Sequence, residues 1–84
     1  MARTSAVELC QMLKTEATAG QDDSAVNNLR LRILDFFITS NVPDDTFEEV
    51  LKARLDDPDP AKEQSKVICT EILQAWQASQ SDRT

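Results

Sequence analysis

Hydrophobic residues recur at helical spacing in four stretches of the chain, and residues 29–38 form the densest apolar stretch. This stretch begins with alternating leucine and arginine, a pattern that suits a β-strand, but the alternation fails at Ile33–Leu34 and again at 36–38. On a helix the apolar residues sort into two stripes, which predicts a central helix with neighbours on more than one side. The first stripe contains Val26, Leu29, Ile33, Phe36 and Phe37, and the second contains Leu31, Leu34 and Ile38.

Helix start signals precede all four periodic stretches. Ser5 followed by Glu8 three positions later fits a capping box, and Ser24 is a suitable N-cap for the central helix. Asp59 before Pro60 is typical of a helix start, with proline at the first helical position. We therefore expect four helices, over residues 5–18, 24–41, 45–56 and 60–79, and an all-α, compact four-helix domain.

The remaining helix boundaries depend on breakers and on an acidic cluster. Gly20 is a natural residue to follow the first helix in the left-handed conformation. Pro43 keeps the residue before it out of the helical region and so ends the central helix. For the third helix the sequence offers Asp44, Asp45 or Thr46 as the N-cap, and Thr46 with Glu49 fits a second capping box.

The chain of 84 residues has the length of one domain. We expect residues 1–84 to form a single helical domain, with residues 1–4 and 80–84 flexible. No secretory segment and no apolar run long enough to span a membrane is evident, which favours a cytoplasmic protein. Cys10 and Cys69 are far apart in the sequence and fall on apolar faces, so we interpret them as reduced, buried hydrophobic residues.

Charge and composition narrow the possible functions. The formal net charge is −6 and there is no histidine. The acidity argues against nucleic acid and anionic membranes as partners, because both require a basic face. The absence of histidine removes the commonest general base and the commonest metal ligand. Residues 57–60 lack the glycine of a calcium-binding loop. We predict no catalytic, cofactor-binding or metal-binding residue and no enzymatic activity.

Acidic residues are concentrated between positions 43 and 59, where seven carboxylates face two basic residues for a net charge of −5. Solubility and helix capping explain part of this cluster. The alternative is a docking face for a basic protein, which would speed association and select the partner. The acidic candidates for partner binding are Asp44, Asp45, Glu48, Glu49, Asp56 and Asp57.

Three apolar residues of the central helix extend this candidate surface. If the other helices cover only one stripe, then Leu31, Leu34 and Ile38 form an exposed patch of the kind that marks protein interfaces. Trp76 is expected to close the core, with a role as an interface anchor as the alternative.

The segment around Asp23-Ser24 resembles the acyl and peptidyl carrier proteins, which are also small, acidic and four-helical. In that family a serine that follows an aspartate at the start of the second helix carries phosphopantetheine, and Ser24 matches that position. Ala25 stands where the family usually has leucine, and the first loop has about five residues where the family has some twenty. The resemblance implies a carrier modified on Ser24, as the alternative to a plain N-cap.

Together these features favour a non-enzymatic protein–protein interaction module, such as an adaptor, an inhibitor or a small regulatory subunit. The expected partner is another protein with a basic face, and homo-oligomerisation is left open.

Overall fold

Four α-helices and one short 3₁₀ turn make up residues 4–81, which are the residues that the computed structural model describes. The all-α class and the four predicted helices are confirmed, and residues 29–38 are helical rather than extended. The helices are α1 (Ala6–Ala19), α2 (Ala25–Ser40), α3 (Asp44–Leu55) and α4 (Glu63–Ser81), with the 3₁₀ turn η1 (Pro60–Lys62) before α4.

The predicted boundaries agree with the structure to within two residues, except at the start of α4. There Pro60 opens a 3₁₀ turn and regular α-helix begins only at Glu63. At its other end α4 continues to Ser81, past the predicted end at residue 79, and Gln80 Nε2 donates a hydrogen bond to the carbonyl of Thr4. The chain ends 1–4 and 80–84 were expected to be flexible, and residues 1–3 and 82–84 of these ends lie outside the described residues.

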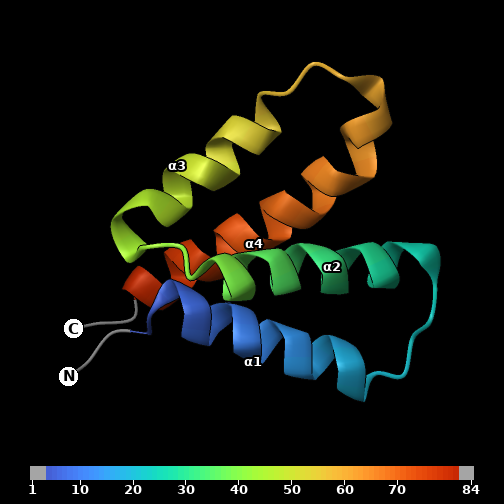
Figure 1. Ribbon diagram of the computed structural model, residues 1–84, viewed down its shortest axis with the longest axis horizontal. Coiled ribbons are helices and arrows are strands. Elements are labelled where there is room, and N and C mark those ends of the chain that lie inside the picture. The colour runs from blue at the N-terminus through green and yellow to red at the C-terminus, as the bar shows by residue number, and fades with distance from the viewer. Residues whose placement is uncertain (1–3, 82–84) are drawn as a thin grey trace.

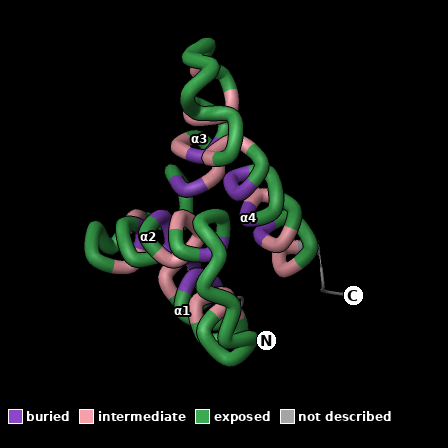
Figure 2. The backbone as a smooth tube through the Cα atoms, turned by 90° about the vertical axis from the view of Figure 1, so that its right-hand side faces the viewer, coloured by how far each residue is buried: buried purple, intermediate pink, exposed green. Residues whose placement is uncertain are grey.

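The helices form two antiparallel hairpins that meet at an angle. α1 packs along α2, α3 packs along α4, and α4 also contacts both helices of the first hairpin (Figure 1). The distal part of the α3–α4 hairpin projects beyond the first hairpin, and most of its surface is exposed there (Figure 2). Because α4 of the second hairpin also packs against α1 and α2, the core is continuous from α1 to α3.

Aromatic rings form the centre of the core where the two hairpins meet. Phe47 of α3 lies between Phe37 of α2 and Trp76 of α4, with edge-to-face ring centroids 5.1 Å and 5.0 Å apart. This geometry is favourable for aromatic pairs beyond the apolar area that they bury. The remaining buried hydrophobic residues are Ala6, Leu9, Cys10, Ile33, Leu34, Leu51, Ile68, Cys69 and Ile72. Trp76 is thus a core residue, as its preferred interpretation predicted.

The buried face of α2 differs from the predicted one. Leu34, which was assigned to the second stripe, is 0% exposed, whereas Phe36 of the first stripe is 49% exposed. Adjacent helical residues point about 100° apart, and the packed helices cover the direction of Phe37 but not that of Phe36. Phe37 packs against Phe47 of α3, and Phe36 is left at the edge, where the Arg54 guanidinium of α3 lies 5.1 Å from its ring centroid.

The predicted N-caps are confirmed where the capping side chain and the N–H group that it accepts are close in the sequence. Ser5 and Glu8 form the full capping box of α1, and the Ser24 hydroxyl accepts the N–H of Asn27 at the start of α2. Asp59 caps η1 by accepting the N–H of Ala61 at 3.0 Å. Each of these bonds satisfies an N–H group that has no partner within its own helix.

Two predictions about capping residues are wrong, although the boundaries of the two helices agree. Gly20 keeps a right-handed helical conformation at φ −69°, and the left-handed residue is the next one, Gln21, at φ 53°. At α3 the N-cap is Pro43, which has no side-chain acceptor, and the Thr46 hydroxyl instead donates to the Pro43 carbonyl. The second capping box is therefore absent, and Asp44 is the first residue of α3 rather than its cap.

Candidate functional site

Three of the six candidate acids have partners inside the structure. Asp44 Oδ1 accepts the backbone N–H of Ala6 at 2.8 Å, and Asp57 Oδ1 accepts the N–H of Asp59 at 3.0 Å. Glu48 forms an ion pair with Lys52 one turn later, at 2.9 Å. These carboxylates have structural roles within the chain, which accounts for part of the acidic cluster without a partner protein.

The other three acids form an exposed ridge. Asp45, Glu49 and Asp56 have no side-chain hydrogen bond or ion pair to any residue within 4–81. Asp45 and Glu49 lie one turn apart on α3, and Asp56 is the C-cap that follows it. The spacing of four and then seven positions places all three on one side, opposite the buried side chains of Phe47 and Leu51. We call Asp45, Glu49 and Asp56 the acidic ridge. All three residues of the ridge are exposed.

The three apolar candidates of α2 do not form an exposed patch. Leu34 is completely buried and Ile38 packs against the core, while Leu31 is half-buried. α1 covers this side of α2, and an ion pair of 2.6 Å between Lys14 and Asp35 joins the two helices there. The prediction that Leu34 could contact a partner is therefore wrong, because the α1–α2 hairpin uses the second stripe for its own packing.

Other large apolar side chains are exposed instead, and none of them was predicted to contact a partner. Met12 of α1, Phe36 of α2 and Val67 of α4 are each about half exposed. These side chains come from different helices. The sequence did not distinguish Phe36 from Phe37, because two adjacent residues of a helix can both be buried, as Ile33 and Leu34 are.

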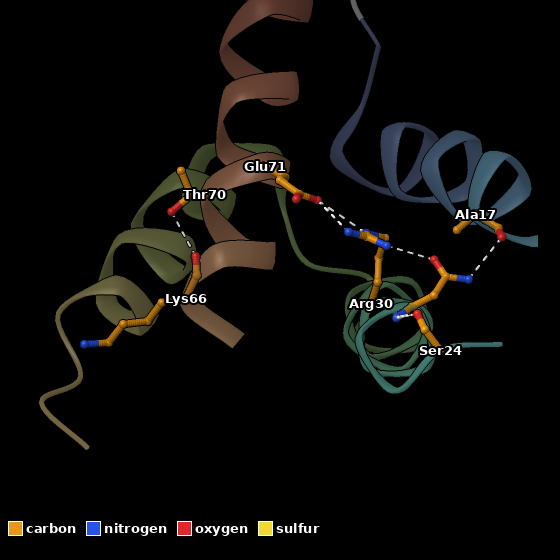
Figure 3. A network of polar contacts seen from close by, with 7 residues as sticks. Ala17, Ser24, Arg30, Lys66, Thr70 and Glu71 are labelled. Carbon is orange, nitrogen blue, oxygen red and sulfur yellow. Dashed lines mark hydrogen bonds and ion pairs between the residues drawn. The ribbon is translucent and has the colours of Figure 1, made fainter. Parts of the chain in front are cut away.

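A polar network joins the end of α1, the start of α2 and the middle of α4 (Figure 3). Its centre is Asn27, which is only 4% exposed. The Asn27 amide donates to the carbonyls of Ala17 at 3.2 Å and Asp22 at 2.7 Å, and its oxygen accepts from Arg30 Nη1 at 2.8 Å. Arg30 Nε and Nη2 both donate to Glu71 Oε1, at 3.3 Å and 3.0 Å. A buried polar group with all these partners stabilises the loop between α1 and α2.

A pocket of about 290 Å³ opens beside this network, between α1, α2 and α4. Its apolar lining comes from Leu13, Ala17, Leu34 and Ile72. Glu16, Arg30 and Glu71 line its polar part, each from a different helix. Sequence reasoning missed this pocket, because its residues come from three segments and none of them belongs to a recognisable motif.

Ser24 and the two cysteines have clear local environments. Ser24 is exposed, and its hydroxyl oxygen accepts the Asn27 N–H at 3.2 Å, as predicted for an N-cap. The Ser24 N–H donates to Asp22, which holds the pKa of that carboxyl below its usual range. Burial raises the pKa of the Cys10 thiol to about 12 and also raises the pKa of Cys69. The predicted burial of both cysteines is confirmed, and neither has the lowered pKa of a reactive thiolate.

Residues 4–81 contain neither a cluster of metal ligands nor a helix that could span a membrane. No three carboxylate or thiol side chains there are grouped closely enough to hold a metal ion. None of the helices in this part of the chain is long and apolar enough to cross a lipid bilayer.

Comparisons with protein-family models, with curated proteins and with solved structures each gave no match to this chain.

Proposed function

We propose that this protein is a non-enzymatic protein–protein interaction module, acting in the cytoplasm as an adaptor, inhibitor or small regulatory subunit. The acidic ridge is its docking face, and the partner is a protein with a basic face. The observation that supports this proposal is that Asp45, Glu49 and Asp56 lie along one exposed side of α3 and its C-cap, and their carboxylates have no hydrogen bond or ion pair within residues 4–81.

The ridge acts mainly on the rate and selectivity of association. Exposed charges attract an oppositely charged protein from a distance, which raises the association rate and disfavours acidic competitors. Each exposed ion pair contributes only about 0–1 kcal/mol of affinity, so most of the affinity comes from apolar contacts made after docking. Physiological salt screens such charges over about 8 Å, which makes the association rate sensitive to salt.

The test compares two variants with the same change in charge. Asp45→Asn and Glu49→Gln neutralise two acids of the ridge, whereas Asp23→Asn and Glu63→Gln neutralise two exposed acids elsewhere. Proteins retained by each variant from native lysate are quantified by mass spectrometry, and the association rate of the retained partner is then measured across a salt series. We expect only the ridge variant to lose the partner or to slow its association, with a difference that shrinks at high salt. Equal behaviour of the two variants would contradict the proposal.

A carrier protein modified on Ser24 remains the alternative function. The supporting observation is that Ser24 is exposed at the start of α2, where a modifying enzyme would have access to its hydroxyl. The intact mass of the protein purified from its native cells separates the two functions. We expect the mass of the unmodified chain apart from ordinary N-terminal processing, and a phosphopantetheine adduct on Ser24 would replace our first proposal with the second.

A further inference from the structure

The pocket between α1, α2 and α4 has an apolar floor and a charged rim. Among its apolar residues, Leu34 and Ile72 are almost fully buried, and Leu13 and Ala17 of α1 are half-buried. Asn27, whose amide donates to the Ala17 carbonyl, also lines the pocket. At about 290 Å³ the pocket is slightly smaller than the roughly 300–1,000 Å³ of pockets for drug-sized ligands. It therefore suits a short ligand or a single side chain.

The charges on the rim favour a cation. The positive charge of Arg30 is already matched by Glu71 Oε1, which accepts two of its N–H groups, and a third N–H is used by Asn27 (Figure 3). Glu16 lines the same pocket from α1, and its carboxylate has no hydrogen bond or ion pair to a side chain within residues 4–81. Two carboxylates and one guanidinium leave the rim with a formal charge of −1, within a protein whose net charge is −6.

We propose that this pocket binds an organic cation, in which an ammonium or guanidinium group is attached to a short alkyl chain. The cationic group lies against the Glu16 carboxylate and the second oxygen of Glu71, and the alkyl chain lies on Leu13 and Ala17. The ligand is either a free alkylamine or the side chain of a lysine or arginine in a bound protein. This site is separate from the acidic ridge on α3 and does not depend on the function proposed for it.

The experiment titrates the ¹⁵N-labelled full chain with n-pentylammonium and follows its amide resonances by NMR. Pentanol and pentanoate serve as probes of the same length with no charge and with the opposite charge. A lysine blocked at both ends represents a protein side chain. We expect saturable shifts around Ala17 and Asn27, with n-pentylammonium binding about fivefold more tightly than pentanol, as one exposed ion pair allows. Binding of the blocked lysine as well would assign the site to a protein side chain, and binding of the free amine alone would assign it to a small molecule.

Two variants test whether the shifts come from this pocket. Glu16→Gln removes the anionic partner from an exposed position and should weaken n-pentylammonium about fivefold while leaving pentanol unchanged. Ala17→Leu fills the pocket and should abolish the binding of every probe, and Glu63→Gln is the control for a lost charge elsewhere. Tighter binding of pentanoate would overturn the proposal by making Arg30 the anchor. An absence of saturable shifts at the pocket, or shifts that Glu16→Gln and Ala17→Leu leave unchanged, would also overturn it.

Discussion

Asp44, the first residue of α3, accepts a hydrogen bond from the backbone N–H of Ala6, the first residue of α1, at 2.8 Å. The two residues are 38 positions apart, so this bond ties the start of one hairpin to the start of the other. Ser5 and Glu8 satisfy two further N–H groups at the same helix end. The acidic residue that looked like a cap for its own helix is thus an additional cap for α1.

Asp44→Ala should lower the free energy of unfolding by about 0.5–2 kcal/mol, the usual cost of losing a side-chain cap. Asp45→Ala is the matched control, because Asp45 lies in the same first turn of α3 but is exposed and makes no such bond. Both variants lose the favourable interaction of a carboxylate with the helix dipole, so the difference between them reports the cap. Urea unfolding followed by circular dichroism measures it, and equal losses in the two variants would contradict the role of Asp44.

Phe36 and Phe37 are neighbours in sequence but differ in burial, which gives a second matched pair. Phe37 is 1% exposed and contacts Phe47, so Phe37→Ala should lower stability by about 3–5 kcal/mol. Phe36 is half exposed, and Phe36→Ala should lower stability by only about 1–2 kcal/mol through lost contact with Arg54 and partial burial. Thermal unfolding of both variants checks this order, and the opposite order would mean that α2 is rotated about its axis.

The sequence was sufficient for features that depend on nearby residues. Ser5, Ser24 and Asp59 act on N–H groups two or three positions ahead, and their roles were predicted correctly. The rotation of α2 about its axis was not predicted correctly. Its apolar residues cover most of its circumference, and only packing decides which of them face α1 and α4. Phe36 is at the edge and Leu34 is buried for that reason.

The end of α1 offers a test of backbone strain. Gln21 has a left-handed conformation, which costs a residue with a side chain roughly 1–2 kcal/mol relative to glycine, whereas Gly20 is right-handed. Gln21→Gly should therefore raise stability by about 0.5–1 kcal/mol. Gly20→Ala should raise it by about 0.4–1 kcal/mol, because an added methyl would have no neighbour closer than 3.8 Å and the unfolded chain would lose freedom. Chemical denaturation measures both changes, and a loss of stability in Gly20→Ala would show that the left-handed residue is Gly20 after all.

The candidate site was predictable only in part, because some of its features depend on how the helices pack. The excess of acids on α3 is visible in the sequence, and the helical period was enough to align Asp45 with Glu49 on one face. Which acids are free was not visible, since Asp44 bonds to a distant helix and Glu48 pairs with Lys52. The pocket was not visible either, because Glu16, Arg30 and Glu71 meet only when three helices are packed together.

The capping box of α1 predicts a pH dependence of stability. The Glu8 carboxylate accepts the backbone N–H of Ser5 at 3.1 Å, and this bond, with the Ser5 hydroxyl beside it, lowers the pKa of Glu8 in the folded state. A carboxyl whose pKa is lower when folded stabilises the protein above its unfolded pKa of about 4.3, and that contribution is lost as the pH falls through the folded pKa. Glu8→Gln keeps a side-chain oxygen for the Ser5 N–H but removes the ionisation.

We therefore expect wild type to be more stable than Glu8→Gln at pH 7, and we expect this difference to shrink as the pH falls below about 4.3. At a pH below the folded pKa the protonated Glu8 and the glutamine should be nearly equivalent, because both then present a neutral acceptor to the Ser5 N–H. Asp22 also has a lowered pKa, but it is unchanged in both proteins and cancels from the comparison. Urea unfolding at a series of pH values between 2 and 7 measures the difference. A constant difference over this range would mean that the charge of Glu8 does not strengthen the capping box.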